Sequence, residues 1–204
     1  MLKMGLSKKQ GEYGQYWGND YYTSTALNMD QMKLNAKYIY KYFSNKDYTK
    51  NAICGMLGNM QTESTLNPGR WEGDRVEWQG HGYGIVQWTP YTKYTTWCKD
   101  RPEDMNTNLD RIVYEVEYNK QWIKTESYPL TFYDFMQSYK TPEYLAQAFL
   151  HNYERPADPD QPTRSAQARF WWDYLSSIKP DPPVRVQNTR KWLCSRCFRI
   201  NIRR

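Results

Sequence analysis

The apolar residues of this 204-residue chain recur roughly every three to four positions, which is the spacing of amphipathic helices. The first such segment is expected to start after Asp30 as N-cap, and the second after Thr49. Each segment places a continuous apolar face toward a core. These two faces consist of Met32, Ala36, Ile39, Tyr40 and Phe43, and of Ile53, Met56, Leu57 and Met60.

Glycine and proline interrupt this pattern between residues 67 and 90, which indicates loops or a small hairpin. Helices are expected again from about 107 to 124, from Thr131, from Thr141 and from about 163 to 177. The chain therefore predicts a mainly α fold, a helical bundle with one glycine-rich insertion after the second helix. The apolar positions assigned to the later helices include Leu109, Ile112, Val113, Val116, Ile123, Phe132, Phe135, Met136, Tyr139, Leu145, Ala148, Phe149, Ala166, Phe170, Trp171, Tyr174 and Leu175.

The charge of the chain is unevenly distributed and suggests three parts. Residues 1–29 are polar and aperiodic and are expected to form a loose arm, and 30–178 form one domain. Residues 179–204 are expected to form a proline-rich linker and a basic tail, and together they carry a net charge of +7. Because the whole chain carries +6, residues 1–178 have a net charge of −1. A domain that binds nucleic acid carries its positive charge on the folded surface, so no nucleic-acid partner is expected.

The cysteines and histidines do not form a metal motif. Cys194 and Cys197 make a lone C-x-x-C, and His81 and His151 are the only histidines. We therefore expect no metal and no cofactor. The chain also lacks an apolar run of about 18 residues for a membrane span, and no signal peptide is recognised at its N-terminus.

Glu63 interrupts the apolar face of the second predicted helix. It stands three residues after Met60, near the point where Asn67-Pro68-Gly69 stops the helix. Burial disfavours a carboxylate, and so does the partial negative charge of a helix C-terminus. Both effects favour the protonated acid that a general acid requires. On spacing alone, a solvated glutamate in a frayed last turn is the alternative.

The segment GHGYGIVQWTP adds the components of a sugar-binding site. Tyr83 and Trp88, with Trp71 upstream, provide rings that stack on sugars, and Gln87 provides an amide for hydroxyl and N-acetyl groups. A nucleotide loop is disfavoured, because no strand precedes the glycines and no Lys-Ser/Thr pair follows them.

Three motifs in this order, NAICGMLGNMQTESTLNPG, GYGIVQWTP and YERPADPDQP, closely resemble the phage tail-type lysozymes. More distantly, the chain is similar to goose-type lysozymes and lytic transglycosylases. The resemblance covers roughly residues 30–177. It implies a lysozyme-like α+β fold and cleavage of the β-1,4 bond between N-acetylmuramic acid and N-acetylglucosamine of peptidoglycan, with Glu63 as the catalytic acid.

A second carboxylate is less well defined. Glu72, Asp74 and Glu77 lie in the insertion and are candidates, although each is equally consistent with a solvated loop acid. Enzymes of the transglycosylase type need only one glutamate, because the 6-hydroxyl of the substrate attacks. Tyr153 of YERP stands where related enzymes keep a site tyrosine, and packing at a helix end is its alternative.

The resemblance also suggests where the protein acts. Its expected partners are peptidoglycan strands and other phage tail proteins, and its expected location is the virion tail or outside the lysed host. The basic tail is either the remnant of a second domain, which its pattern favours, or a cationic patch for anionic wall polymers. The alternative functions are a non-catalytic glycan-binding or structural tail component and, less favoured, a DNA-binding protein that uses the tail.

Overall fold

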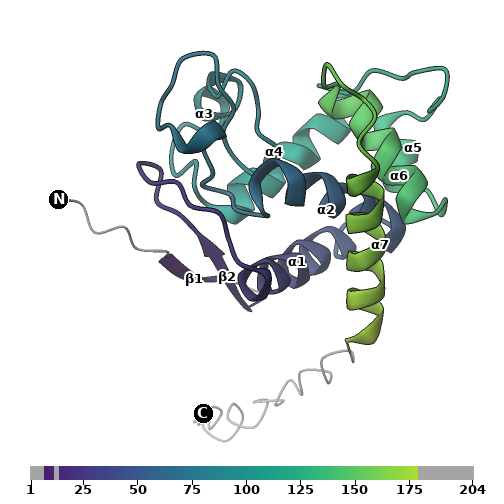
Figure 1. The fold of residues 1–204 in the computed structure, drawn as a ribbon, viewed down its shortest axis with the longest axis horizontal. Coiled ribbons are helices and arrows are strands. Elements are labelled where there is room, and N and C mark those ends of the chain that lie inside the picture. Colours follow the sequence, from purple (N-terminus) through teal and green to yellow (C-terminus); the bar gives the residue numbers. More distant parts are fainter. Residues whose placement is uncertain (1–6, 12–13, 179–204) are drawn as a thin grey trace, which may run out of the picture.

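The computed structural model describes residues 7–11 and 14–178, which form the mainly helical fold that the sequence predicts (Figure 1). Strands β1 and β2 form an antiparallel hairpin in which Ser7 pairs with Gly18 and Gly11 with Gly14. The predicted linker and basic tail, 179–204, lie outside the described residues. The elements are β1 (Ser7–Gly11), β2 (Gly14–Gly18), α1 (Met29–Ser44), α2 (Lys50–Ser64), the 3-10 turn η1 (Glu72–Asp74), α3 (Thr92–Cys98), α4 (Met105–Glu117), α5 (Phe132–Met136), α6 (Pro142–Phe149), the π-helical turn η2 (Leu150–Glu154) and α7 (Pro162–Ser177).

Helix α2 lies in the middle of the fold, with α6 and α7 packed directly against it (Figure 1). Two glycines allow this close approach. A Cβ at Gly55 would lie 2.9 Å from the carbonyl carbon of Leu145, and a Cβ at Gly58 would lie 2.8 Å from the backbone nitrogen of Ala168. The apolar face predicted for α2 is fully buried, so the helix of Glu63 is anchored by the core.

The cap of α2 is confirmed and that of α1 is corrected. The Thr49 side chain accepts a hydrogen bond from the Ala52 N–H at 3.2 Å. For α1, the cap is Asn28 and not Asp30, because Asn28 has extended backbone angles and its side chain accepts the N–H of Gln31 at 3.0 Å. Asp30 lies inside the first turn, where its charge is still favourable.

The prediction of a loose arm before residue 30 is wrong for the stretch from Tyr16 to Asn28. Tyr16 and Leu27 are buried in the core, and the Tyr16 hydroxyl donates to Asp104 at 2.9 Å. The Leu27 N–H donates to Thr65 Oγ1 at 2.8 Å, just beyond the end of α2. The first three residues of this stretch end β2, and the rest packs without regular structure, so it leaves no periodic signal in the sequence.

Helix α4 ends at Glu117, earlier than predicted, because Asn119 and Gln121 take left-handed backbone angles. The turn exposes 59% of Ile123 and buries Trp122 in its place. Tyr139, predicted on the next apolar face, is 86% exposed because α5 ends at Met136.

The buried face of α7 also differs from the predicted one. Ala166 and Phe170 are exposed, whereas Arg164 and Ala168 are buried together with the correctly predicted Trp171 and Leu175. The helix is rotated in this way because Ala168 fits against Gly58 of α2. An arginine is thereby carried into the core.

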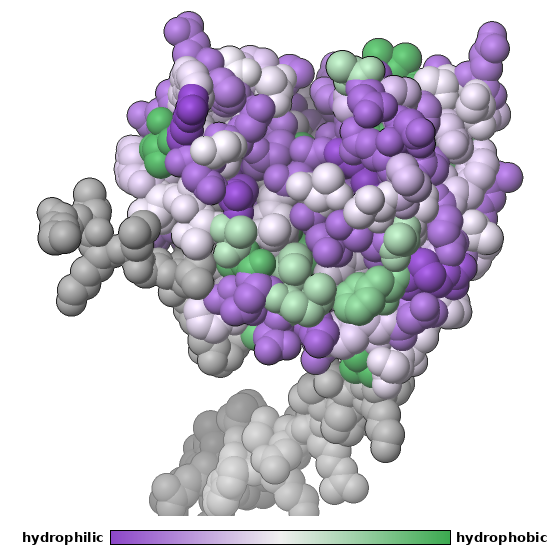
Figure 2. Space-filling model, in the orientation of Figure 1, coloured by the Kyte–Doolittle hydropathy of each residue, from purple (hydrophilic) through white to green (hydrophobic). Residues whose placement is uncertain are grey.

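The surface is mostly hydrophilic on the face shown in Figure 2, with apolar side chains gathered below its middle. Met29 and Leu34 of α1 and Phe170 of α7 are among the exposed apolar side chains. In the described part of the chain, no helix is both long enough and apolar enough to cross a membrane. Nor does this part bring together three or more His, Cys, Asp or Glu side chains that could hold a metal ion.

Candidate active site

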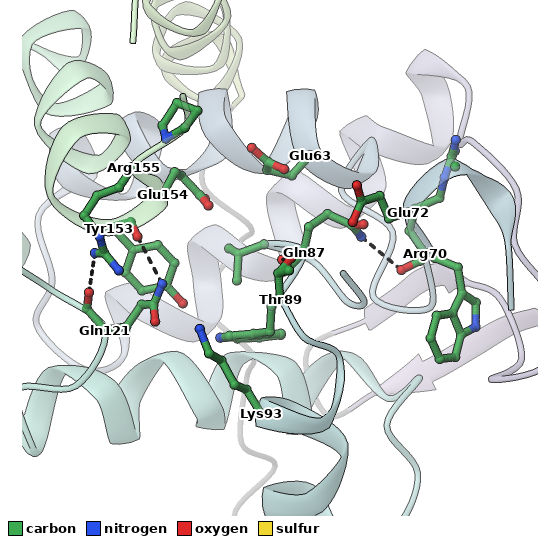
Figure 3. Close-up of a pocket in the computed structure, with 15 residues that line it drawn as sticks. Glu63, Arg70, Glu72, Gln87, Thr89, Lys93, Gln121, Tyr153, Glu154 and Arg155 are labelled. Carbon is green, nitrogen blue, oxygen red and sulfur yellow. Dashed lines mark hydrogen bonds between the residues drawn. The ribbon is translucent and has the colours of Figure 1, made fainter. Parts of the chain in front are cut away.

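A cleft of about 530 Å³ opens beside the C-terminal end of α2 (Figure 3). Its walls come mainly from Glu63, from loop residues 70–73 and 86–89, and from residues 153–156 at the end of η2. The structure therefore brings together parts of all three motifs that the sequence singles out.

The end of α2 is an unusual turn. Thr65 and Leu66 both have left-handed backbone angles, with φ of 55° and 57°, although neither is glycine. Such angles are unfavourable for side chains with a Cβ and persist where the surroundings impose them. Here the hydroxyl of Ser64 donates to the Ile85 carbonyl at 2.8 Å, and the Asn67 side chain donates to Thr25 at 2.7 Å. These bonds fix the helix end on which Glu63 stands.

Glu63 lies at the edge of the buried face of α2, with 21% of its side chain exposed to the cleft. Its Oε1 accepts a hydrogen bond from Nη2 of Arg164 at 2.6 Å. The sequence does not predict this ion pair. It places a positively charged guanidinium directly against the carboxyl group.

Arg164 is itself held on all sides. It is 4% exposed, its Nη1 donates to Asn59 at 3.0 Å, and its Nε donates to Gln161 at 2.6 Å. The Asn59 amide donates in turn to the carbonyls of Gly55 and Ala146. The guanidinium therefore has a fixed position, and it orients Glu63.

Gln87 presents an unsatisfied acceptor to the cleft. Its Nε2 donates to the carbonyls of Arg70 at 3.0 Å and Gly84 at 2.8 Å (Figure 3 draws the first). These bonds leave Oε1 buried and without a hydrogen-bond partner. Since buried polar atoms are normally paired, this oxygen is suited to accept a bond from a bound molecule.

Of the predicted aromatic residues, Trp71, Trp88 and Tyr153 line the cleft. Tyr83 does not, so the prediction that its ring meets the substrate is corrected. The Tyr83 ring is completely buried, packs 4.5 Å from the Trp71 ring, and pairs through its backbone with Trp71 and Trp88. It serves as a support for the two tryptophans.

Beneath Trp88 and Tyr153 lies Glu115, which no motif in the sequence singles out. Its carboxylate accepts from the Tyr153 hydroxyl at 2.6 Å, from Trp88 Nε1 at 3.1 Å and from Arg111 Nε at 2.8 Å. Burial raises the pKa of Glu115, and these donors act in the opposite direction. The only signal for it in the sequence is a glutamate within the apolar face of a predicted helix.

The three candidate second carboxylates differ in position. Glu72 lines the cleft, and its carboxylate accepts from the Gly82 N–H at 2.7 Å. Asp74 is paired with Arg70 at 2.9 Å and does not line the cleft, and Glu77 is exposed outside it. The structure therefore places one of the three in the cleft that Glu63 also lines.

A further carboxyl group, Glu154, was not among the candidates. It lines the cleft next to Tyr153, and Figure 3 shows its carboxyl group and that of Glu63 pointing toward one another. Its Oε1 is buried without a hydrogen-bond partner. Burial, and then the negative charge of Glu63, raise the pKa of Glu154 well above its usual range. Its place in YERP was the available signal.

Comparison with known proteins relates this chain to phage proteins. The sequence model of a family described as phage tail lysozyme matches residues 34–175. "Morphogenesis protein 1" of Bacillus phage B103 is 46% identical over 160 residues, which are 76% of this chain and 43% of that relative. The chain thus spans less than half the length of this relative.

Proposed function

The chain belongs to the phage tail lysozyme family, whose members degrade peptidoglycan, and on this premise we propose that it cleaves the β-1,4 bond between N-acetylmuramic acid and N-acetylglucosamine. The observation that carries the proposal is the position of Glu63. It is the carboxyl group that ends the central helix, and it faces a cleft large enough for sugar residues. Glu63 is the general acid of this reaction.

In the proposed step, Glu63 transfers its proton to the glycosidic oxygen as the bond from that oxygen to the anomeric carbon breaks. The leaving sugar departs with a new hydroxyl group. The remaining glycosyl cation is captured either by water, which leaves a reducing end, or by its own 6-hydroxyl, which leaves a 1,6-anhydro sugar. In both cases the attacking hydroxyl loses a proton, which returns to the Glu63 carboxylate. Glu72 is the candidate for assisting the attacking water, since it lies in the same cleft.

The other cleft residues are suited to hold the sugar chain. The unpaired Oε1 of Gln87 can accept a hydrogen bond from an N-acetyl N–H or a hydroxyl. Trp71, Trp88 and Tyr153 also line the cleft, but their side chains are buried, so we expect them to shape its wall rather than to stack on sugar rings. We place the protein in the phage tail, where it opens the wall when the phage infects its host.

The decisive experiment replaces Glu63 by Gln, which keeps the shape of the side chain but cannot donate the proton. Purified walls are incubated with each protein, and the released muropeptides are identified by mass spectrometry. We expect wild-type protein to release glycan fragments and Glu63→Gln to lose activity by at least about a hundredfold. The control is Glu117→Gln, an exposed glutamate at the end of α4.

The outcome also separates the alternative functions. Fragments with reducing ends identify a hydrolase, and 1,6-anhydro ends identify a lytic transglycosylase. Release by Glu63→Gln at the wild-type rate would exclude the proposed mechanism. If wild-type protein binds walls and releases nothing, the protein is a non-catalytic tail component.

A further inference from the structure

Glu154 occupies a position that no structural role explains. It is the last residue of η2, a π-helical turn closed by the bond from the Arg155 N–H to the Leu150 carbonyl at 2.8 Å. π-Helical turns are rare in proteins, and those that do occur are often found at functional sites. This turn directs the Glu154 side chain into the cleft, toward Glu63 (Figure 3).

The charges around Glu154 come from several elements. Glu63 on α2 and Glu115 on α4 are negative, and Arg164 on α7 and the adjacent Arg155 are positive. Neither arginine bonds to Glu154, since Arg164 is bonded to Glu63 and Arg155 donates to backbone carbonyls. Oε1 of Glu154 stays buried without a partner. A carboxylate in this position is unfavourable, whereas the protonated acid is not.

Two carboxyl groups in such a site do not ionise independently. The first loses its proton easily, because a single negative charge is stabilised by Arg164. The second resists ionisation, because its charge would repel the first. The pair therefore retains one proton to a higher pH than an isolated glutamate would.

We infer that Glu63 and Glu154 form one acid, which holds a single proton at neutral pH, and that Glu154 acts through Glu63 to keep this proton available for the glycosidic oxygen. The inference rests on the proposed function of Glu63. Glu154 itself does not touch the reacting atoms. After Glu63 has given its proton to the leaving oxygen, both groups are carboxylates, and the pair then takes up the proton that the attacking water or 6-hydroxyl releases.

The pH dependence of the rate tests this inference, with Glu154→Gln as the variant. Glutamine keeps the shape of the side chain and cannot ionise, so the site loses the second carboxyl group that makes the pair retain its proton. We expect the alkaline limb of the rate profile to move down by about one pH unit. Activity at about pH 7.5 then falls roughly tenfold, while activity at about pH 5 stays within about threefold of wild type.

Glu117→Gln is the matched control and should keep the wild-type profile. A wild-type profile for Glu154→Gln overturns the inference. A loss of activity that is equal at every pH also overturns the inference, because the alkaline limb of the rate profile has then not moved. Either result leaves the proposed function standing if Glu63→Gln remains inactive, whereas absence of released fragments from wild-type protein would reject the proposed function itself.

Protein stability provides a second measurement that does not depend on activity. Because the pKa of Glu154 is raised in the folded protein, its stabilising effect is present below the unfolded-state pKa and is lost as the pH rises through the folded-state pKa. Glu154→Gln should therefore unfold at a higher temperature than wild type at neutral pH, with a difference that shrinks toward about pH 4.5. A difference that does not change with pH overturns the inference. If Glu154→Gln does not fold, Glu154→Leu takes its place in this measurement.

Discussion

Nη2 of Arg164 lies 2.6 Å from Oε1 of Glu63, although the two residues are 101 positions apart. The bond joins α7 to the end of α2 and fixes the carboxyl group at the mouth of the cleft. It also places a permanent positive charge next to the proposed acid. The same arginine therefore contributes to the stability of the fold and to the protonation of the site.

Replacing Arg164 by Leu should separate these two contributions. The change leaves acceptors on Glu63, Asn59 and Gln161 without their donor, in a region that excludes water. We expect a loss of about 3–5 kcal/mol in the free energy of unfolding, measured by denaturant titration. In the fraction that stays folded, the alkaline limb of the rate should move to higher pH, because Arg164 no longer favours the ionised form of the pair and only Arg155 remains.

Arg169→Leu, on the same helix, is the matched control for this change. Arg169 pairs with Glu143, but 40% and 35% of the two side chains are exposed. Exposed pairs contribute little, so the expected loss is below about 1 kcal/mol. Equal losses for the two variants would show that Arg164 contributes no more than a surface ion pair.

The local signals of the sequence predicted the helices well and the contacts between them poorly. The helix starts at Thr49 and Thr141 are predictable, because both residues are N-caps and capping depends on residues within one turn. Arg164 was missed, since no local pattern tells which polar residue of an amphipathic helix turns inward. Here that choice is made by the fit of Ala168 against Gly58, which is a contact between distant segments.

The same reasoning explains the outcome for the candidate site. Glu63 could be singled out because a carboxyl group on an apolar face is locally anomalous. Tyr83 was misplaced in the cleft because an aromatic ring near a binding motif can equally support it from below. Glu154 adjoins a predicted residue, yet only its three-dimensional neighbours distinguish it from a solvated glutamate.

Gly58→Ala should disturb the site from the side opposite to the cleft. The new methyl group would lie 2.8 Å from the backbone nitrogen of Ala168 and closer still to the carbonyl oxygen of Arg164, so α7 must move away. The higher helix propensity of alanine offsets part of this cost. We expect a net loss of about 2 kcal/mol in the free energy of unfolding.

Because α7 carries Arg164, Gly58→Ala should also lower the rate of fragment release. Thr62→Ala, at an exposed position of α2, is the control and should change stability by less than about 1 kcal/mol. Full activity in Gly58→Ala, together with an unchanged unfolding temperature, would mean that the helix contact is not tight.

Glu115→Ala tests the support beneath the cleft. It leaves the Tyr153 hydroxyl, Trp88 Nε1 and Arg111 without their acceptor, and we expect a loss of about 3 kcal/mol at acidic pH. The raised pKa of Glu115 determines how this loss of stability depends on pH. The stabilisation it gives is present below the unfolded-state pKa and is lost as the pH rises through the folded-state value. The difference from wild type should therefore shrink as the pH rises, and denaturant titrations that show a growing difference would contradict this.

Gln87→Ala separates substrate binding from proton transfer. Its Oε1 is buried and unpaired in the free protein, so we expect the proposed glycan substrate to donate a hydrogen bond to it and to keep this bond while the glycosidic bond breaks. An interaction that is equal in both states changes KM and leaves kcat nearly unaltered. On soluble glycan chains we expect KM to rise roughly tenfold, which corresponds to about 1.4 kcal/mol.

Gln167→Ala is the control, because this amide bonds to Thr62 on the surface and away from the cleft. A fall in kcat with unchanged KM would instead place Gln87 among the groups that act only in the transition state.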